Sequence, residues 1–82
     1  MVEMLRFNAV ITATGYPRGS IYEQIKRGTF PKPVSMGMRT AAWPKHEVEK
    51  IMHGRIAGKS EDEIKLLVRQ IHADRQSIGQ AA

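Results

Sequence analysis

The sequence contains no cysteine among its 82 residues. This absence excludes disulfide bonds, thiolate nucleophiles and the usual cysteine ligands of zinc fingers. The sequence also lacks a run of about 18 apolar residues, and no apolar stretch follows a basic start, so we expect neither a membrane-spanning helix nor a signal peptide. We therefore expect a cytoplasmic protein. Its length allows one small domain with a thin core, which a partner chain would enlarge.

Catalytic signatures are missing as well. The chain carries no nucleophile elbow, no phosphate-binding loop and no paired acids in apolar surroundings. Glu47 and Glu49 are two residues apart on one expected helix and therefore point to different faces. His46, His53 and His72 lack the spacing of metal ligands and are expected on the surface. We expect no enzyme, no metal, no cofactor and no small-molecule substrate.

The basic residues are concentrated in the middle of the chain. The formal net charge is +5, and all of it falls between residues 18 and 45, where six Lys and Arg residues oppose Glu23 alone. The remaining residues carry seven basic and seven acidic side chains. A local basic surface on an otherwise neutral chain is typical of proteins that bind a polyanion. A solvated basic face without a partner is the alternative.

A helix, a tight turn and a second helix are expected near the start of the chain. Apolar residues from Phe7 to Thr14 follow the spacing of one helix face, and Asn8 is the expected cap. Gly15 fits the end of this helix, because glycine readily takes a positive φ. Pro17 fits the first turn of the next helix.

The second helix is expected to end at Gly28, and a hairpin is expected to follow it. Ile21 and Ile25 form the narrow apolar side of the helix, and two prolines, at positions 31 and 33, prevent its continuation. Residues 33–43 then read as two short strands with a turn near Gly37. Pro44 ends this segment.

Two further helices are expected after residue 44. Val48, Ile51, Met52 and Ile56 mark the apolar face of the third helix, which ends near Gly58. Ser60 and Glu63 have the spacing of a capping box at the start of the fourth helix, and residues 76–82 are expected to fray. We predict a DNA-binding unit at residues 1–58 and a C-terminal helix with its tail at residues 59–82. The apolar stripe of that helix consists of Ile64, Leu67, Val68 and Ile71.

The first two helices predict a helix-turn-helix whose second helix enters the major groove of duplex DNA, with the hairpin as a wing. Arg18 is expected to read guanine and Gln24 to read adenine. Arg39 at the wing tip is expected to enter a minor groove or to neutralise a phosphate. Tyr22 is expected either to pack beside Ile25 or to touch DNA. The predicted DNA-binding residues are Arg18, Gly19, Ser20, Tyr22, Glu23, Gln24, Lys26, Arg27, Lys32, Arg39 and Thr40, of which Ser20, Lys26 and Arg27 are assigned to phosphates.

The chain resembles the AlpA family of prophage regulators from about Leu5 to Ile51. The most specific part is the run from Tyr22 to Pro33, which ends in Phe-Pro-Lys-Pro, with Arg39 and Trp43 at the expected distances. The other matching residues are Val10, Thr14, Gly15, Ser20, Ile21, Gly37, Val34, Glu47 and Val48.

The resemblance implies a mainly α-helical winged helix-turn-helix of the MerR or excisionase type, in which Trp43 and Phe30 pack the wing onto the helices. It implies either a transcriptional regulator of prophage or mobile-element genes, or an excisionase that shapes attachment-site DNA for a recombinase. This chain departs from the pattern at Pro17, where serine is common, and near Ile51, where a second tryptophan is common. The fourth helix is an addition to the usual short form.

Several partners remain open at this stage. The apolar stripe of the fourth helix either covers the core or pairs with a second copy of the chain, and monomers are also expected to be able to line up side by side on DNA. A protein-interaction adaptor with an incidental basic patch is the alternative from another class. RNA is less favoured, because an aromatic platform for stacking bases is missing.

Overall fold

The computed structural model describes residues 2–81. In this part of the chain a three-stranded sheet and four helices follow one another in the order β1, α1, α2, β2, β3, α3, α4. The strands are β1 (Met4–Arg6), β2 (Val34–Ser35) and β3 (Ala41–Pro44). The helices are α1 (Phe7–Thr14), α2 (Arg18–Arg27), α3 (Lys45–Ile56) and α4 (Glu61–Ala81).

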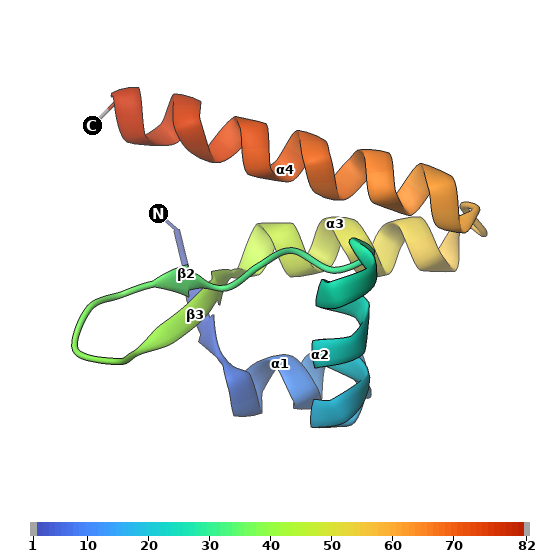
Figure 1. Cartoon of the computed structure of the whole chain (residues 1–82), viewed down its shortest axis with the longest axis horizontal. Helices are drawn as coiled ribbons and strands as arrows, with labels where there is room; N and C mark the ends of the chain where they lie inside the picture. Colours follow the sequence, from blue (N-terminus) through green and yellow to red (C-terminus); the bar gives the residue numbers. More distant parts are fainter. Residues whose placement is uncertain (1, 82) are drawn as a thin grey trace.

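The predicted winged helix-turn-helix is confirmed. Helices α1 and α2 lie together on the side of α3 opposite α4, and the β2–β3 hairpin extends to one end of the molecule (Figure 1). The sheet has the order β1-β3-β2 with antiparallel pairing. Strand β1, which the sequence did not predict, pairs Leu5 with Trp43 and Arg6 with Ala42. The hairpin is therefore anchored to the segment that leads directly into α1.

The tip of the hairpin lies between β2 and β3. It is closed by backbone hydrogen bonds from Met36 N–H to the Thr40 carbonyl at 2.7 Å and from Thr40 N–H to the Gly37 carbonyl at 2.9 Å. Three consecutive residues at the tip have positive φ, which is +83° at Gly37, +47° at Met38 and +60° at Arg39. Only the first of these is a glycine, so the tip holds two side-chain-bearing residues in the left-handed region.

One hydrophobic core joins all four helices to the sheet. Its centre is Trp43, whose indole packs edge-on against Phe7 at a centroid distance of 5.3 Å and against Phe30 at 6.0 Å. The indole N–H donates to the Pro31 carbonyl at 2.8 Å, which satisfies the polar group of a fully buried side chain. The resemblance-based expectation that Trp43 and Phe30 pack the wing onto the helices is confirmed. The buried core consists of Val10, Ile21, Phe30, Trp43, Val48, Ile51, Ile64, Val68 and Ile71.

Helix α4 lies along α3 and covers this core (Figure 1). Ile64, Val68 and Ile71 are buried and Leu67 is packed against them, so the stripe covers the core, one of the two expectations. Gly54 of α3 permits the close approach, since a Cβ there would lie 3.0 Å from Ile64 Cδ1. The helix continues from residue 76 to residue 81, where the sequence predicted a frayed tail. The proposed division at residues 58 and 59 stays a prediction.

Two local expectations about helices were wrong. Arg6, not Asn8, occupies the N-cap position of α1, and no side chain caps this helix. Ile56, expected on the apolar face of α3, is 83% exposed, because α3 ends at this residue and the chain turns away through Gly58 toward α4. The predicted capping box is confirmed. Ser60 N–H donates to the Glu63 carboxylate at 2.9 Å, and Glu63 N–H donates to the Ser60 hydroxyl at 3.2 Å.

Candidate nucleic-acid interface

A tight turn fixes helix α2 against helix α1. Gly15 has a φ of +75° and its N–H donates to the Ile11 carbonyl at 2.9 Å, which ends α1. The Thr14 hydroxyl accepts a hydrogen bond from Tyr16 N–H at 3.2 Å. Pro17 then occupies the N-cap position of α2. These two hydrogen bonds fix the backbone of the turn that leads from α1 into α2.

One face of α2 is turned to solvent. Ile21 is fully buried and anchors the opposite face. Residues at positions 18, 19, 22, 23, 26 and 27 are all exposed, and this spacing places them on one continuous side of the helix. Glu23 and Arg27 form an exposed ion pair at 3.3 Å. Along this face Arg18 lies at the start of α2, Tyr22 near its middle and Lys26 in its last turn.

Ser20 and Gln24, although predicted to bind DNA, lie on the side of α2 that faces α3. The Gln24 amide donates to the Ser20 hydroxyl at 3.2 Å. Its carbonyl oxygen accepts a hydrogen bond from the Arg55 guanidinium of α3 at 3.5 Å. Both ends of the Gln24 side chain are thus hydrogen-bonded within the protein, and its role as an adenine reader stays a prediction.

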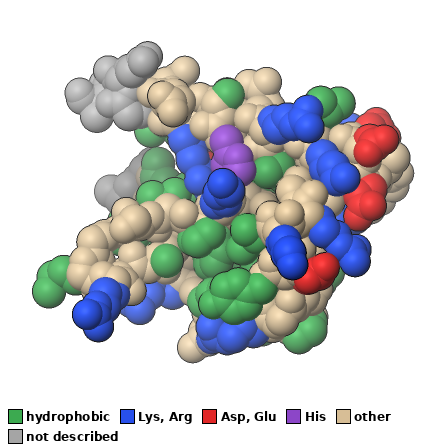
Figure 2. Space-filling model, viewed as in Figure 1, with side chains coloured by type: hydrophobic (Ala, Val, Ile, Leu, Met, Phe, Trp, Pro, Cys, Tyr) green, Lys and Arg blue, Asp and Glu red, His purple; other side chains and the backbone are tan. Residues whose placement is uncertain are grey.

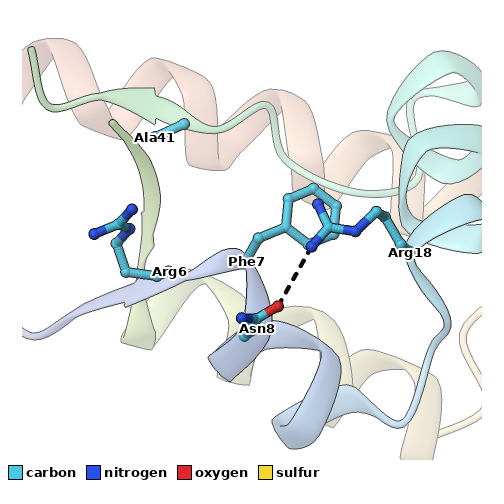
Figure 3. Close-up of a pocket in the computed structure, with 5 residues that line it drawn as sticks. All are labelled: Arg6, Phe7, Asn8, Arg18 and Ala41. Atoms are coloured by element: carbon cyan, nitrogen blue, oxygen red, sulfur yellow. Dashed lines mark hydrogen bonds between the residues drawn. The ribbon is translucent and has the colours of Figure 1, made fainter. Parts of the chain in front are cut away.

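Arg18 is held in place by two residues at the start of α1 (Figure 3). Its guanidinium carbon lies 4.2 Å from the centroid of the Phe7 ring, which is within the range of a cation–π interaction. Its Nη2 donates to the Asn8 side-chain oxygen at 3.3 Å. Tyr22 packs on the same Phe7 ring at a centroid distance of 5.2 Å and is still 57% exposed. Tyr22 therefore packs on Phe7, whereas the sequence suggested Ile25, and most of its side chain remains accessible.

The wing supplies a second basic element. Arg39 is exposed at the hairpin tip and Thr40 is half-buried beside it. Lys32 lies in the linker between α2 and β2, with its side chain exposed. Figure 2 shows Lys and Arg side chains over the hairpin tip and over the α1–α2 end, whereas most of the acidic side chains visible on that face lie where α4 begins.

Helix α4 fixes the linker that carries Lys32. The His72 imidazole Nε2 accepts a hydrogen bond from Lys32 N–H at 3.1 Å, and Arg75 Nη2 donates to the Lys32 carbonyl at 2.7 Å. Arg75 also forms a bidentate ion pair with the buried Glu47 carboxylate of α3. His72 was expected on the surface but is half-buried in this cluster. Burial and the nearby Arg75 charge lower the pKa of His72 from its ordinary value of 6.5.

Two residues near the predicted interface were missed by the sequence reasoning. Arg6 and Asn8 flank Phe7 in the sequence; Asn8 is hydrogen-bonded to Arg18, and Arg6 lies on the other side of Phe7 (Figure 3). The available signal was a basic and an amide side chain on either side of an aromatic residue at the expected start of a helix. That signal is weak without knowledge of the contact with α2.

Comparison with known proteins places the chain in a family. The family model described as Prophage CP4-57 regulatory protein (AlpA) matches residues 3–56. The chain belongs to the AlpA family of prophage regulatory proteins. The sequence-based identification is thereby confirmed. The chain is also similar to the uncharacterized protein ORF88 of Enterobacteria phage P4, with 46% identity over 55 residues that cover 67% of this chain and 62% of the relative. No solved structure was found to match the chain.

The AlpA match contains the sheet, the helix-turn-helix and helix α3. Helix α4 begins at Glu61 and lies outside it. Within residues 2–81, no helix combines the length and apolar character needed to cross a membrane. In the same range, no three His, Asp or Glu side chains cluster in a way that would hold a metal ion.

Proposed function

We propose that this AlpA-family protein is a sequence-specific double-stranded DNA-binding protein that regulates prophage or mobile-element genes. The observation that carries the proposal is the solvent-exposed face of α2, which bears Arg18, Tyr22 and Lys26. The one acidic residue on this face, Glu23, is paired with Arg27. A helix with such a face, preceded by a fixed turn and followed by a wing, fits the dimensions of the major groove.

The contacts divide into two kinds. We assign base-edge contacts to Tyr22 and Lys26, because both are exposed on the outer face of α2 and lysine can donate to guanine acceptors. We assign backbone contacts to Arg18, Arg27, Lys32 and Arg39, which surround this face from the start of α2 to the wing. Gly19 allows the DNA to approach closely, as no side chain projects there. Ser20, Gln24 and Thr40 support the geometry through contacts within the protein.

The experiment is selection of binding sites from a random duplex library, followed by affinity measurement with three proteins. Wild type is expected to enrich one motif. Lys26→Ala is expected to lose about 1 to 3 kcal/mol of discrimination at one position of that motif. Arg69→Ala, on the exposed side of α4, removes an equal charge away from the interface and is expected to behave as wild type.

Salt separates this proposal from a protein-interaction adaptor. Binding through several Lys and Arg contacts to phosphates should weaken by orders of magnitude between about 50 and 200 mM salt, whereas a helix docked in an apolar groove should respond little. Failure to enrich any motif, together with weak salt dependence, would contradict the proposal.

A genome-wide footprint on host DNA then defines the role. Footprints confined to promoters support transcriptional control. Closely spaced, repeated occupancy at an attachment site would instead assign the protein to excision, with a recombinase as its partner.

A further inference from the structure

An open depression of about 520 Å³ lies between the start of α1, the start of α2 and the wing strand β3 (Figure 3). It is lined by Arg6, Phe7, Asn8, Arg18 and Ala41. Arg6 and Arg18 stand on opposite sides of it in the close-up, with Phe7 between them and Ala41 above. The depression is thus a basic hollow built from four elements, β1, α1, α2 and β3.

The polar groups around the depression are almost all hydrogen-bond donors. The single side-chain acceptor is the Asn8 oxygen, and Arg18 already occupies it at 3.3 Å. Within residues 2–81, neither Arg6 nor Arg18 takes part in an ion pair, and no acidic residue lines the depression. Two guanidinium groups facing an uncompensated space favour an oxyanion, which arginine binds with planar, charge-assisted hydrogen bonds.

Phe7 determines which anion Arg18 can reach. The guanidinium plane is held over the aromatic ring at 4.2 Å and tied to Asn8 by one amino group. Arg18 is therefore kept beside the start of α1 and is not extended along the outer face of α2. This position suits a group outside the groove better than a base edge within it.

The position of the depression matches the path of a DNA strand. A helix in the major groove and a wing at the adjacent minor groove are always separated by one sugar-phosphate backbone, because that backbone is the wall between the two grooves. The depression lies between α2 and wing strand β3. With α2 and the wing docked as in the proposed function, the strand that separates the grooves passes over it.

We infer that Arg6, Asn8 and Arg18 form a binding site for one phosphodiester of the DNA backbone, which fixes the register of α2 in the major groove. The inference rests on the proposed function. Arg6 and Arg18 bind the phosphate oxygens from two sides, the Asn8 amide adds a donor, and Phe7 positions Arg18.

The test is a scan of the selected duplex in which single phosphates are replaced by neutral methylphosphonates. One replacement is expected to weaken wild-type binding about tenfold, the lower end for hydrogen bonds to charged groups. The same replacement is expected to have a smaller effect on Arg6→Ala, because one of the three side chains that bind that phosphate is already gone. Arg69→Ala serves as the charge-matched control and should retain the full methylphosphonate effect.

The affinity of Arg6→Ala itself gives a second readout. It should fall by the same factor on the selected duplex and on a random duplex, and the slope of log affinity against log salt should decrease by about 1. Asn8→Ala, measured in the same way, provides a second variant, and circular dichroism checks that each variant is folded.

The outcomes separate this inference from the proposed function. Wild-type affinity and salt slope in both Arg6→Ala and Asn8→Ala would overturn the phosphate site while leaving sequence-specific binding intact. A loss restricted to the selected duplex would show a base contact and would also overturn it. A wild-type protein without sequence preference would contradict the proposed function. The comparison of wild type with Arg6→Ala on methylphosphonate duplexes would still test the phosphate site on any bound duplex.

Discussion

The Arg75 guanidinium of α4 binds both carboxylate oxygens of Glu47 on α3, at 2.6 and 2.9 Å. The Glu47 side chain is 3% exposed, and that of Arg75 is 23% exposed. The same guanidinium donates to the Lys32 carbonyl in the linker before the wing. One side chain outside the AlpA match therefore connects α3, α4 and the wing linker.

Removal of Arg75 is expected to destabilise the protein strongly. Arg75→Met should lower the free energy of unfolding by about 3 kcal/mol, because it leaves the Glu47 carboxylate buried without a partner. Urea unfolding followed by circular dichroism measures the change. Arg69→Met on the exposed side of the same helix is the control and should lie close to wild type. If the double variant Glu47→Leu with Arg75→Met were no more stable than Arg75→Met alone, the loss would not come from the unpaired charge.

The His72 cluster predicts a stability that depends on pH. Burial and then the Arg75 charge lower the pKa of His72 below 6.5; the Glu47 charge opposes them, and the Lys32 charge adds a smaller lowering effect. In the unfolded chain His72 takes up its proton first as the pH falls, so the folded state is increasingly disfavoured from about pH 7 through 6.5 toward the lowered folded pKa. Protonation of Nε2 also removes the acceptor for Lys32 N–H.

The urea midpoint should therefore decline between about pH 7.5 and pH 5 in wild type. His72→Gln should flatten this decline, because glutamine offers an acceptor that does not titrate. An identical pH profile in the two proteins would show that His72 is not responsible.

The capping box at the start of α4 is expected to contribute measurably. Ser60→Ala should destabilise the fold by about 1 kcal/mol, because the Glu63 N–H loses its acceptor. For a domain of this size that loss corresponds to a decrease of roughly 4 to 8 °C in the melting temperature. Ser60→Thr keeps the hydroxyl and should melt near wild type, so equal losses in both variants would argue against the cap.

The wing tip is expected to tolerate glycine unusually well. Met38 has a φ of +47° and is 98% exposed, so its backbone is strained and its side chain makes few contacts. Met38→Gly should raise the free energy of unfolding by up to about 1 kcal/mol as the left-handed conformation becomes unstrained. Met36→Gly, at a position without positive φ, should not stabilise. A gain in both variants would point to a cause other than strain.

The helices and their ends could be predicted from the sequence because the residues that signal them lie close together in the chain. Apolar spacing of three and four residues marked α1 to α4, and Gly15 and Gly28 take the left-handed conformation expected at helix ends. The hairpin was likewise marked by prolines and by Gly37. In each case the residues that determine the structure lie within one or two turns of one another.

The features that the sequence analysis missed depend on contacts between distant segments. Strand β1 is only three residues long and is defined by pairing with β3, nearly 40 residues later. Gln24 has the residue type of an adenine reader, yet Arg55 from α3 occupies its side chain. Asn8 has the residue type of a helix cap, yet it binds Arg18. Residue type predicted the capacity of these side chains, but tertiary packing determined their partners.

The sequence has one tryptophan, Trp43, and it lies where the wing, α1 and the linker meet. Its indole is fully buried and donates a hydrogen bond to the Pro31 carbonyl, so we expect its fluorescence to be that of an apolar, constrained site. The protein thus carries an intrinsic optical probe. A shift of its emission to longer wavelength reports loss of the core, and a smaller change upon addition of duplex DNA reports movement of the wing relative to the helices, without any attached label.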